Sequence, residues 1–129
     1  MRVVVGITGA TGVIYGIRLL QAFMDAGVES HLVVSEWGGK TIEVETSYTI
    51  EEVKSLATYC YDPMDLTASI ASGSLLIDGM VIAPCSMKSL AAIATGYSEN
   101  LISRAADVTI KEQRPLVLVV RETPLSAVH

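Results

Sequence analysis

The sequence predicts an α/β fold in which helices cover both faces of a parallel sheet. Short apolar runs typical of buried strands alternate with helical patterns along the whole chain. In addition, the first apolar run ends in closely spaced glycines that lead into a helix. A length of 129 residues and a hydrophobic content of 50% suit one domain with a real core. We therefore expect a single domain over residues 1–129.

Four apolar runs rich in β-branched side chains are expected to be strands. They are residues 2–7, 29–34, 79–83 and 115–120. Five segments with apolar residues at helical spacing are expected to be helices. They are residues 13–26, 36–45, 50–57, 86–95 and 100–113. Their ends are marked by Gly27 after the first helix, by Ser35 as N-cap of the second, and by the capping-box spacing of Thr49 and Glu52 before the third. Residues 58–77, rich in Asp, Ser, Thr and Gly, are expected to be the least regular stretch.

Charge and composition limit the function classes. A net charge of -5 argues against nucleic acid or an anionic membrane as partner. No apolar run approaches the ~20 residues that a membrane span needs, and the chain starts without the apolar region and cleavage site of a signal peptide. Cys60 and Cys85 lie far apart, lack metal-ligand spacing and suit a reducing compartment. We expect a cytoplasmic protein with no metal.

The first expected strand leads into a loop with the spacing G-x-x-G-x-x-G, formed by Gly6, Gly9 and Gly12. Glycines allow a sharp turn and a close approach of the backbone to a ligand. The N-terminus of the following helix offers unpaired N–H groups to a phosphate. The spacing differs from the G-x-G-x-x-G of dinucleotide loops, and Thr8 and Thr11 add hydroxyl groups. The loop therefore favours the phosphate of a mononucleotide.

Four polar segments follow the expected strands. They are residues 6–12, 35–37, 84–89 and 121–124. Because ligands of open parallel sheets bind beyond the carboxyl ends of the strands, these segments are expected to meet at one site. Each also has an ordinary interpretation, since Ser35 and Ser86 suit helix N-caps and Arg121 with Glu122 suits a solvated pair. Their occurrence together at one sheet edge favours a site for a phosphate and a polar aromatic ring.

Four segments resemble the UbiX-type flavin prenyltransferases, a family that includes proteins associated with phenolic acid decarboxylases. They are GITGATG (6–12), APCSMKSLA (83–91), RAADV (104–108) and KEQRPLVLVVRETPL (111–125). The resemblance covers essentially the whole chain. It implies a Rossmann-like (flavodoxin-like) three-layer sandwich, FMN as cofactor and homo-oligomers built as dodecamers of trimers. The implied reaction moves a dimethylallyl group from dimethylallyl phosphate to reduced FMN, and prenylated FMN then passes to a UbiD-type decarboxylase.

The resemblance also implies roles for individual residues. The expected FMN-binding residues are Gly9, Ala10, Thr11, Ser35, Ser86, Met87, Lys88, Ser89 and Arg121. Glu45 and Glu122 correspond to the catalytic acids of the family, and Arg104 corresponds to an arginine that binds the prenyl phosphate. Trp37 is expected to line the substrate pocket as a wall for the hydrocarbon. Further prenyl-phosphate ligands of the family lie beyond residue 129, so the resemblance implies a domain truncated at its C-terminus.

Several alternatives remain open at this point. Glu45 also suits a surface carboxylate at a helix end, and Arg104 a solvated helix face. Cys85 is expected to be a small buried hydrophobe and His31 a structural residue. The chain could be an FMN-binding accessory subunit of an aromatic acid decarboxylase without its own catalysis. It could also be a flavin-dependent cysteine decarboxylase, although that group uses a histidine after its second strand, where this chain has Trp37. A nicotinamide oxidoreductase would carry an acidic residue at the end of the second strand.

Overall fold

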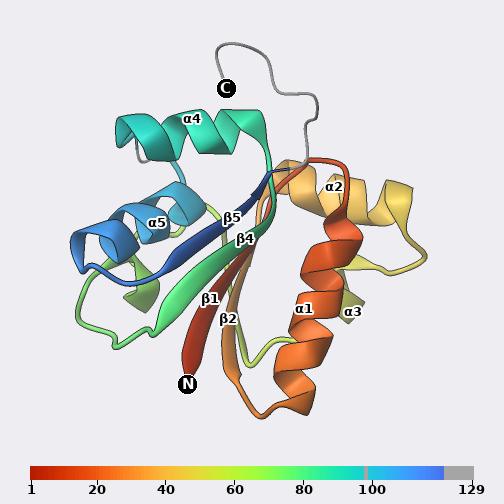
Figure 1. Cartoon of the computed structure of the whole chain (residues 1–129). Coiled ribbons are helices and arrows are strands. Elements are labelled where there is room, and N and C mark those ends of the chain that lie inside the picture. The colour runs from red at the N-terminus through yellow and green to blue at the C-terminus, as the bar shows by residue number, and fades with distance from the viewer. Residues whose placement is uncertain (98, 121–129) are drawn as a thin grey trace.

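Five parallel strands form the central sheet of the computed structural model, which describes residues 1–97 and 99–120. The strand order is β3-β2-β1-β4-β5. The strands are β1 (Arg2–Ile7), β2 (Glu29–Val34), β3 (Tyr59–Tyr61), β4 (Gly79–Cys85) and β5 (Leu116–Val120). Because the connections return each strand in the same direction, the carboxyl ends of β1, β2 and β4 lie together at one edge (Figure 1).

Helices cover both faces of this sheet (Figure 1). They are α1 (Val13–Asp25), α2 (Glu36–Glu45), α3 (Ile50–Lys54), α4 (Met87–Thr95), α5 (Leu101–Lys111) and the short 3-10 helix η1 (Ser69–Ala71). Buried residues of α1, α2 and α3 pack in one apolar cluster, and those of η1 and α5 pack in a second, with α4 against it. The arrangement confirms the expected three-layer α/β sandwich.

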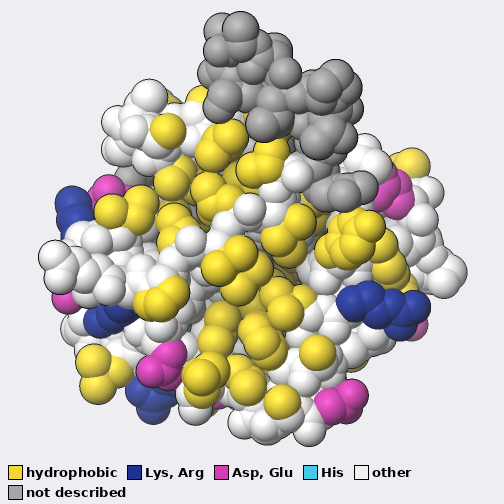
Figure 2. All heavy atoms as spheres, in the orientation of Figure 1, with side chains coloured by type: hydrophobic (Ala, Val, Ile, Leu, Met, Phe, Trp, Pro, Cys, Tyr) yellow, Lys and Arg dark blue, Asp and Glu magenta, His cyan; other side chains and the backbone are white. Residues whose placement is uncertain are grey.

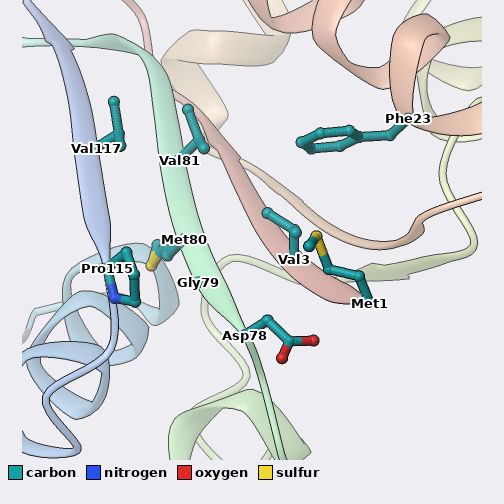
Figure 3. Close-up of a pocket in the computed structure, with 9 residues that line it drawn as sticks. All are labelled: Met1, Val3, Phe23, Asp78, Gly79, Met80, Val81, Pro115 and Val117. Carbon is teal, nitrogen blue, oxygen red and sulfur yellow. The ribbon is translucent and has the colours of Figure 1, made fainter. Parts of the chain in front are cut away.

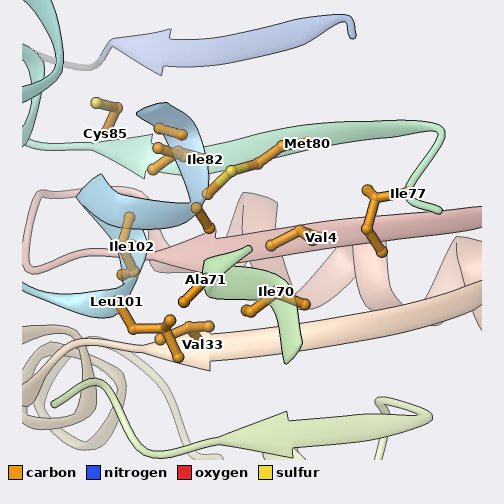
Figure 4. Packing of buried hydrophobic residues seen from close by; sticks show 12 residues of the cluster. Val4, Val33, Ile70, Ala71, Ile77, Met80, Ile82, Cys85, Leu101 and Ile102 are labelled. Carbon is orange, nitrogen blue, oxygen red and sulfur yellow. The ribbon is translucent and has the colours of Figure 1, made fainter. Parts of the chain in front are cut away.

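β1, β2 and most of β4 are buried on both faces, because their side chains alternate between the two clusters. Val3 and Val5 of β1 point toward α1, whereas Val4 points toward α5. Figure 4 shows Ile82 of the sheet near Ile102 of α5, with Val4 in the same cluster on the side of Ile70 and Met80. Each of these side chains is at most 7% exposed. The continuous apolar runs in the sequence follow from this burial on two sides.

Part of the sheet face on the α1 side carries apolar side chains at the surface. Figure 2 shows hydrophobic side chains gathered over β4 and β5 beside α1. An apolar hollow of about 200 Å³ opens there at the amino ends of the strands. Figure 3 shows Phe23 of α1 pointing toward Val3 and Val81 across this hollow. It lies at the opposite end of the strands from the polar segments that the sequence brings together.

Most element bounds agree with the expectations, and the differences are local. β1 and β2 have the expected bounds, α3 ends at Lys54 instead of residue 57, and β4 continues to Cys85. The stretch 58–77, expected to be the least regular, contains only the short elements β3 and η1, which the sequence did not predict. β3 is an edge strand of 3 residues, too short to show an alternating pattern. It is held through its register on β2, with Tyr59 opposite His31.

A membrane-spanning helix, which would need both length and apolarity, is absent from the part of the chain that the structure describes.

Gly16 sets how closely α1 approaches the sheet. A Cβ at this position would collide with the backbone oxygen of Ala83 in β4 and meet the side chain of Ile7. We expect Gly16→Ala to lower the free energy of unfolding by about 1–3 kcal/mol, because helix α1 and the backbone of β4 must move apart to make room for the methyl group. Urea unfolding followed by circular dichroism measures this change.

The matched control is Arg18→Ala on the exposed side of the same helix, where Arg18 contacts Gln21. Surface substitutions of this kind change stability by less than about 0.5 kcal/mol. Equal stability of Gly16→Ala and Arg18→Ala would show that the close approach of α1 is not needed.

Candidate functional site

Thr8 joins the ends of β1 and β4 at the carboxyl edge of the sheet. Its Oγ1 donates to the backbone oxygen of Pro84 at 2.7 Å and accepts from the backbone N–H of Ser86 at 2.9 Å. The side chain is only 2% exposed. The regular register between β1 and β4 ends at Gly6 and Ile82, so Thr8 binds just beyond it. One buried hydroxyl therefore holds the start of the loop before α4 against the end of β1.

Besides α1, the helices α2, α4 and α5 begin at this edge, and each of these three is capped by the side chain of its N-cap residue. Ser35 Oγ accepts from the Gly38 amide at 3.0 Å at the start of α2. Asn100 caps α5 by accepting from the amide of Ser103 at 3.0 Å. The caps confirm Ser35 as an N-cap and the expected start of the last helix. Helix N-termini carry partial positive charge, so their convergence favours an anion.

The cap of α4 leaves hydroxyl donors available. Ser86 Oγ accepts from the Ser89 amide at 3.2 Å and donates its own proton to Ser89 Oγ at 3.0 Å. The proton of Ser89 is then free to point toward a ligand. Ser35 likewise accepts through its oxygen and keeps its proton for donation. The serines that cap these helices can thus also donate hydrogen bonds to a bound phosphate.

These groups enclose a pocket of about 250 Å³. Its lining residues are Thr8, Gly9, Ser35, Trp37, Ser86, Lys88, Ser89, Glu99 and Asn100. The structure therefore brings together five of the expected FMN-binding residues and Trp37. Thr8, whose hydroxyl the sequence places in the phosphate loop, also lines this pocket. Sequence reasoning missed Glu99 and Asn100 as lining residues. Asn100 could have been found from its cap position, whereas no local signal marks Glu99.

A second hollow of about 300 Å³ lies on the other side of Trp37. It is lined by Gly9, Thr11, Trp37, Lys40, Thr41, Val44 and Glu45. Trp37 is 67% exposed, and the Nζ of Lys40 lies 4.4 Å from its ring centroid. A Cβ on Gly9 would come within 2.5 Å of the Trp37 Cβ. Glycine at position 9 is therefore what lets the indole stand between the two hollows.

Glu45 lies at the N-terminus of α1. Its Oε1 accepts from the backbone N–H of Gly12 at 3.2 Å. Gly12 is the N-cap, has a φ of 102° and offers no side-chain cap, so the carboxylate supplies the missing acceptor and complements the helix dipole. The sequence predicts that the unpaired N–H groups at the start of this helix bind a phosphate, whereas the Gly12 amide binds a carboxylate of the chain.

Some expected site residues lie outside the two hollows. Ala10 and Met87 belong to the right loops but line neither hollow. Arg104 is exposed on α5, one turn after Asn100, and its Nε donates to the oxygen of Ala71 at 3.4 Å. Arg121 and Glu122 lie outside the described residues.

Two further residues agree with their expected structural roles. Cys85 is fully buried, and desolvation raises the pKa of its thiol to about 11, which suits a small core residue. His31 is 3% exposed and forms hydrogen bonds of 2.7 Å with Tyr61 and with Glu29. The bond from His31 is the main cause that lowers the pKa of Glu29. Within residues 1–97 and 99–120, no group of His, Cys, Asp and Glu could hold a metal ion.

Fold and site together define a nucleotide-binding α/β protein with its site at the carboxyl edge of a parallel sheet. The family model described as Flavoprotein matches residues 1–129. The chain belongs to this flavoprotein family, which confirms the resemblance found in the sequence.

Curated relatives extend this result. The chain is 59% identical over 129 residues to the probable UbiX-like flavin prenyltransferase of Bacillus subtilis (strain 168), covering 100% of this chain and 63% of that protein. It is 58% identical to flavin prenyltransferase PAD1, mitochondrial, of Saccharomyces cerevisiae (strain ATCC 204508 / S288c), covering 99% of this chain and 53% of that protein. Flavin prenyltransferase LpdB of Lactiplantibacillus plantarum (strain ATCC BAA-793 / NCIMB 8826 / WCFS1) is 57% identical to the chain. The match covers 99% of this chain and 69% of that protein. The chain thus spans between about half and seven tenths of the length of these relatives.

Solved structures agree with the fold. The crystal structure of AnUbiX (PadA1) in complex with FMN and dimethylallyl pyrophosphate has a TM-score of 0.98 and 52% identity, covering 99% of this chain and 68% of that chain. The dodecameric FMN-dependent UbiX-like decarboxylase from Escherichia coli O157:H7 also has a TM-score of 0.98 and 52% identity. The match covers 100% of this chain and 70% of that chain. The cypemycin decarboxylase CypD has a TM-score of 0.79 at 12% identity, and the match covers 98% of this chain and 72% of that chain. This similarity shows a shared fold alone.

We expect Thr8→Val to destabilise the chain by about 1–3 kcal/mol and to weaken binding of an anion in the first pocket. Valine keeps the shape but removes the hydroxyl, so the amide of Ser86 loses its acceptor in a buried place. Chemical unfolding measures the first effect and ligand titration the second. Thr8→Ser, which keeps the hydroxyl, is the control and should retain most of the binding. Equal loss in both variants would contradict a specific role of the hydroxyl group.

We expect Cys85 to react slowly with iodoacetamide in the folded chain. At pH 8, a thiol with a pKa of about 11 carries on the order of a hundredfold less thiolate than an ordinary thiol. The measurement is the labelling rate by mass spectrometry in a Cys60→Ser background, folded and in denaturant, at increasing pH. Labelling should speed up on unfolding and as pH rises toward 11. Rapid labelling of the folded chain at pH 8 would contradict the burial of this thiol.

Proposed function

We propose that the chain is the core of a flavin prenyltransferase that transfers a dimethylallyl group from dimethylallyl phosphate or pyrophosphate to reduced FMN. In this reaction the bond from the allylic carbon to the phosphate oxygen breaks, and new bonds to the flavin ring form. The observation that carries the proposal is the 52% identity and TM-score of 0.98 to a protein crystallised with FMN and dimethylallyl pyrophosphate. Relatives named as flavin prenyltransferases, at 57–59% identity, support it.

The chemistry of the first pocket fits the phosphate of FMN. The hydroxyls of Ser35 and Ser89 can donate protons, and Lys88 adds a positive charge at the start of α4. Three helix N-termini supply further positive potential. We assign phosphate binding to this pocket, with Gly9, Ala10 and Thr11 of the glycine loop and Ser86 with Met87 beside it. Bound FMN supplies the nucleophilic ring that accepts the prenyl group.

The proposed catalytic residues stabilise the charges that develop during transfer. Trp37, exposed between the two hollows, offers an aromatic face to the hydrocarbon as positive charge develops on it. Arg104 would bind the departing phosphate, because a guanidinium matches phosphate oxygens with two parallel donors. Glu45 and Glu122 would move protons between the flavin and the prenyl group. The contact of Glu45 with Gly12 holds that carboxylate beside the second hollow.

The proposal includes partners and location. A UbiD-type decarboxylase would receive the prenylated FMN, and the chain would assemble as a trimer-based homo-oligomer, as supported by the dodecameric relative from Escherichia coli O157:H7. We place the protein in the cytoplasm, in keeping with two cysteines that are both free thiols.

An FMN-binding accessory subunit without catalysis is the second candidate, and a cysteine decarboxylase the third. The chain is similar to the crystal structure of TvaF, an FMN-dependent cysteine decarboxylase, but at 16% identity this similarity shows a shared fold alone. Trp37 stands where that group is expected to place its histidine, and an indole cannot exchange a proton as an imidazole does. Only assay of the flavin itself separates the first two candidates.

The test is mass spectrometry of the flavin extracted after anaerobic incubation with reduced FMN and dimethylallyl phosphate. We expect a prenylated flavin without added metal, and loss of the product in Arg104→Ala with little rescue by Arg104→Lys, because lysine lacks the two-pronged geometry. Cys85→Ala should retain activity and serves as the control. Quenching of FMN fluorescence by the chain reports binding separately.

The possible outcomes separate the candidates. Bound but unmodified flavin would favour the accessory subunit, and tighter binding of nicotinamide dinucleotides than of FMN would contradict the assignment altogether. Prenylated flavin from Arg104→Ala would overturn only the role of that arginine.

A further inference from the structure

Lys88 and Glu99 are the charged residues among the described side chains that line the first pocket. Lys88 lies in the first turn of α4, and Glu99 directly precedes the N-cap of α5. Their Nζ and Oε1 atoms are 3.5 Å apart. The pair therefore joins two of the helix N-termini that form the pocket, and it includes the pocket's one described cation.

This pair places a carboxylate in the wall of an anion site. The side chain of Glu99 is 32% exposed and that of Lys88 is 81% exposed, so Lys88 can swing while Glu99 is the more confined partner. A phosphate with nearly two negative charges that enters the pocket competes with Glu99 for the same ammonium group. It also meets the repulsion of the carboxylate itself.

Resting on the proposed function, we propose that Glu99 is a specificity and exchange residue that limits how tightly the pocket holds a flavin phosphate. A flavin prenyltransferase binds its flavin as a substrate and must release it as a product. Because Lys88 and Glu99 form their ion pair again when the phosphate leaves, the flavin dissociates without leaving an unpaired ammonium group. The neutral serine donors then provide recognition, and Glu99 keeps the binding reversible.

The test uses Glu99→Gln, which keeps the shape and removes the charge. We expect FMN to bind about two- to fivefold more tightly and to dissociate more slowly by the same factor, which is the range measured for exposed ion pairs. Riboflavin, which lacks the phosphate, should bind the variant and the wild-type chain equally. Fluorescence titration and stopped-flow displacement measure these effects. Glu43→Gln, on the exposed side of α2, removes the same charge elsewhere and should change neither ligand.

A double-mutant cycle with Lys88→Gln tests whether Glu99 acts through the lysine. Lys88→Gln should weaken FMN binding, and in that background Glu99→Gln should have less than half of its former effect. Unchanged or weaker FMN binding by Glu99→Gln, an equal change for riboflavin, or a full effect without Lys88 would each overturn the inference. If the wild-type chain binds FMN and Glu99→Gln has no effect, this inference fails and the proposed function stands. If the wild-type chain binds no FMN, both fail.

Discussion

The hydroxyl of Thr8 is the interaction on which the geometry of the site depends. Parallel strands pair through evenly spaced backbone bonds, and the regular register of β1 with β4 ends at Gly6 and Ile82, before Pro84. Proline has no N–H to continue the ladder. The Thr8 side chain takes over by binding both the oxygen of Pro84 and the amide of Ser86. The first turn of α4, with its capping serine, is thereby fixed relative to the glycine loop.

Helix caps give this site its hydroxyl donors at no additional structural cost. A serine at an N-cap accepts a hydrogen bond through its oxygen, which stabilises the helix start. The same hydroxyl keeps a proton, and in Ser35 that proton can be donated to a ligand. In α4 the proton of Ser86 passes to Ser89, which becomes the donor. Stability and recognition therefore favour the same residue type at the same position, so the capping role of these serines does not exclude the binding role proposed for them.

Sequence reasoning succeeded where local chemistry decides the structure. The bounds of β1 and β2 follow from apolar runs, and Ser35 marks the start of α2 because capping is a local interaction. β3 could not be predicted in this way, since its three residues gain their structure from pairing with β2 and from the stacking of Tyr59 on His31. Glu99 likewise became visible only when α4 and α5 were placed side by side, because its partner Lys88 is distant in sequence.

The glycine loop carries a sequence signature for phosphate, yet the chain itself already uses one of its amides. Gly12 offers the expected N–H at the start of α1, but the carboxylate of Glu45 binds it. An anionic ligand would have to displace a covalently tethered competitor there, whereas the donors of Ser35 and Ser89 face an open pocket. Gly9 of the same loop lets the backbone pass close to Trp37. Under the proposed function, the hydroxyl groups of Ser35 and Ser89 therefore add phosphate donors to which no internal acid is bound.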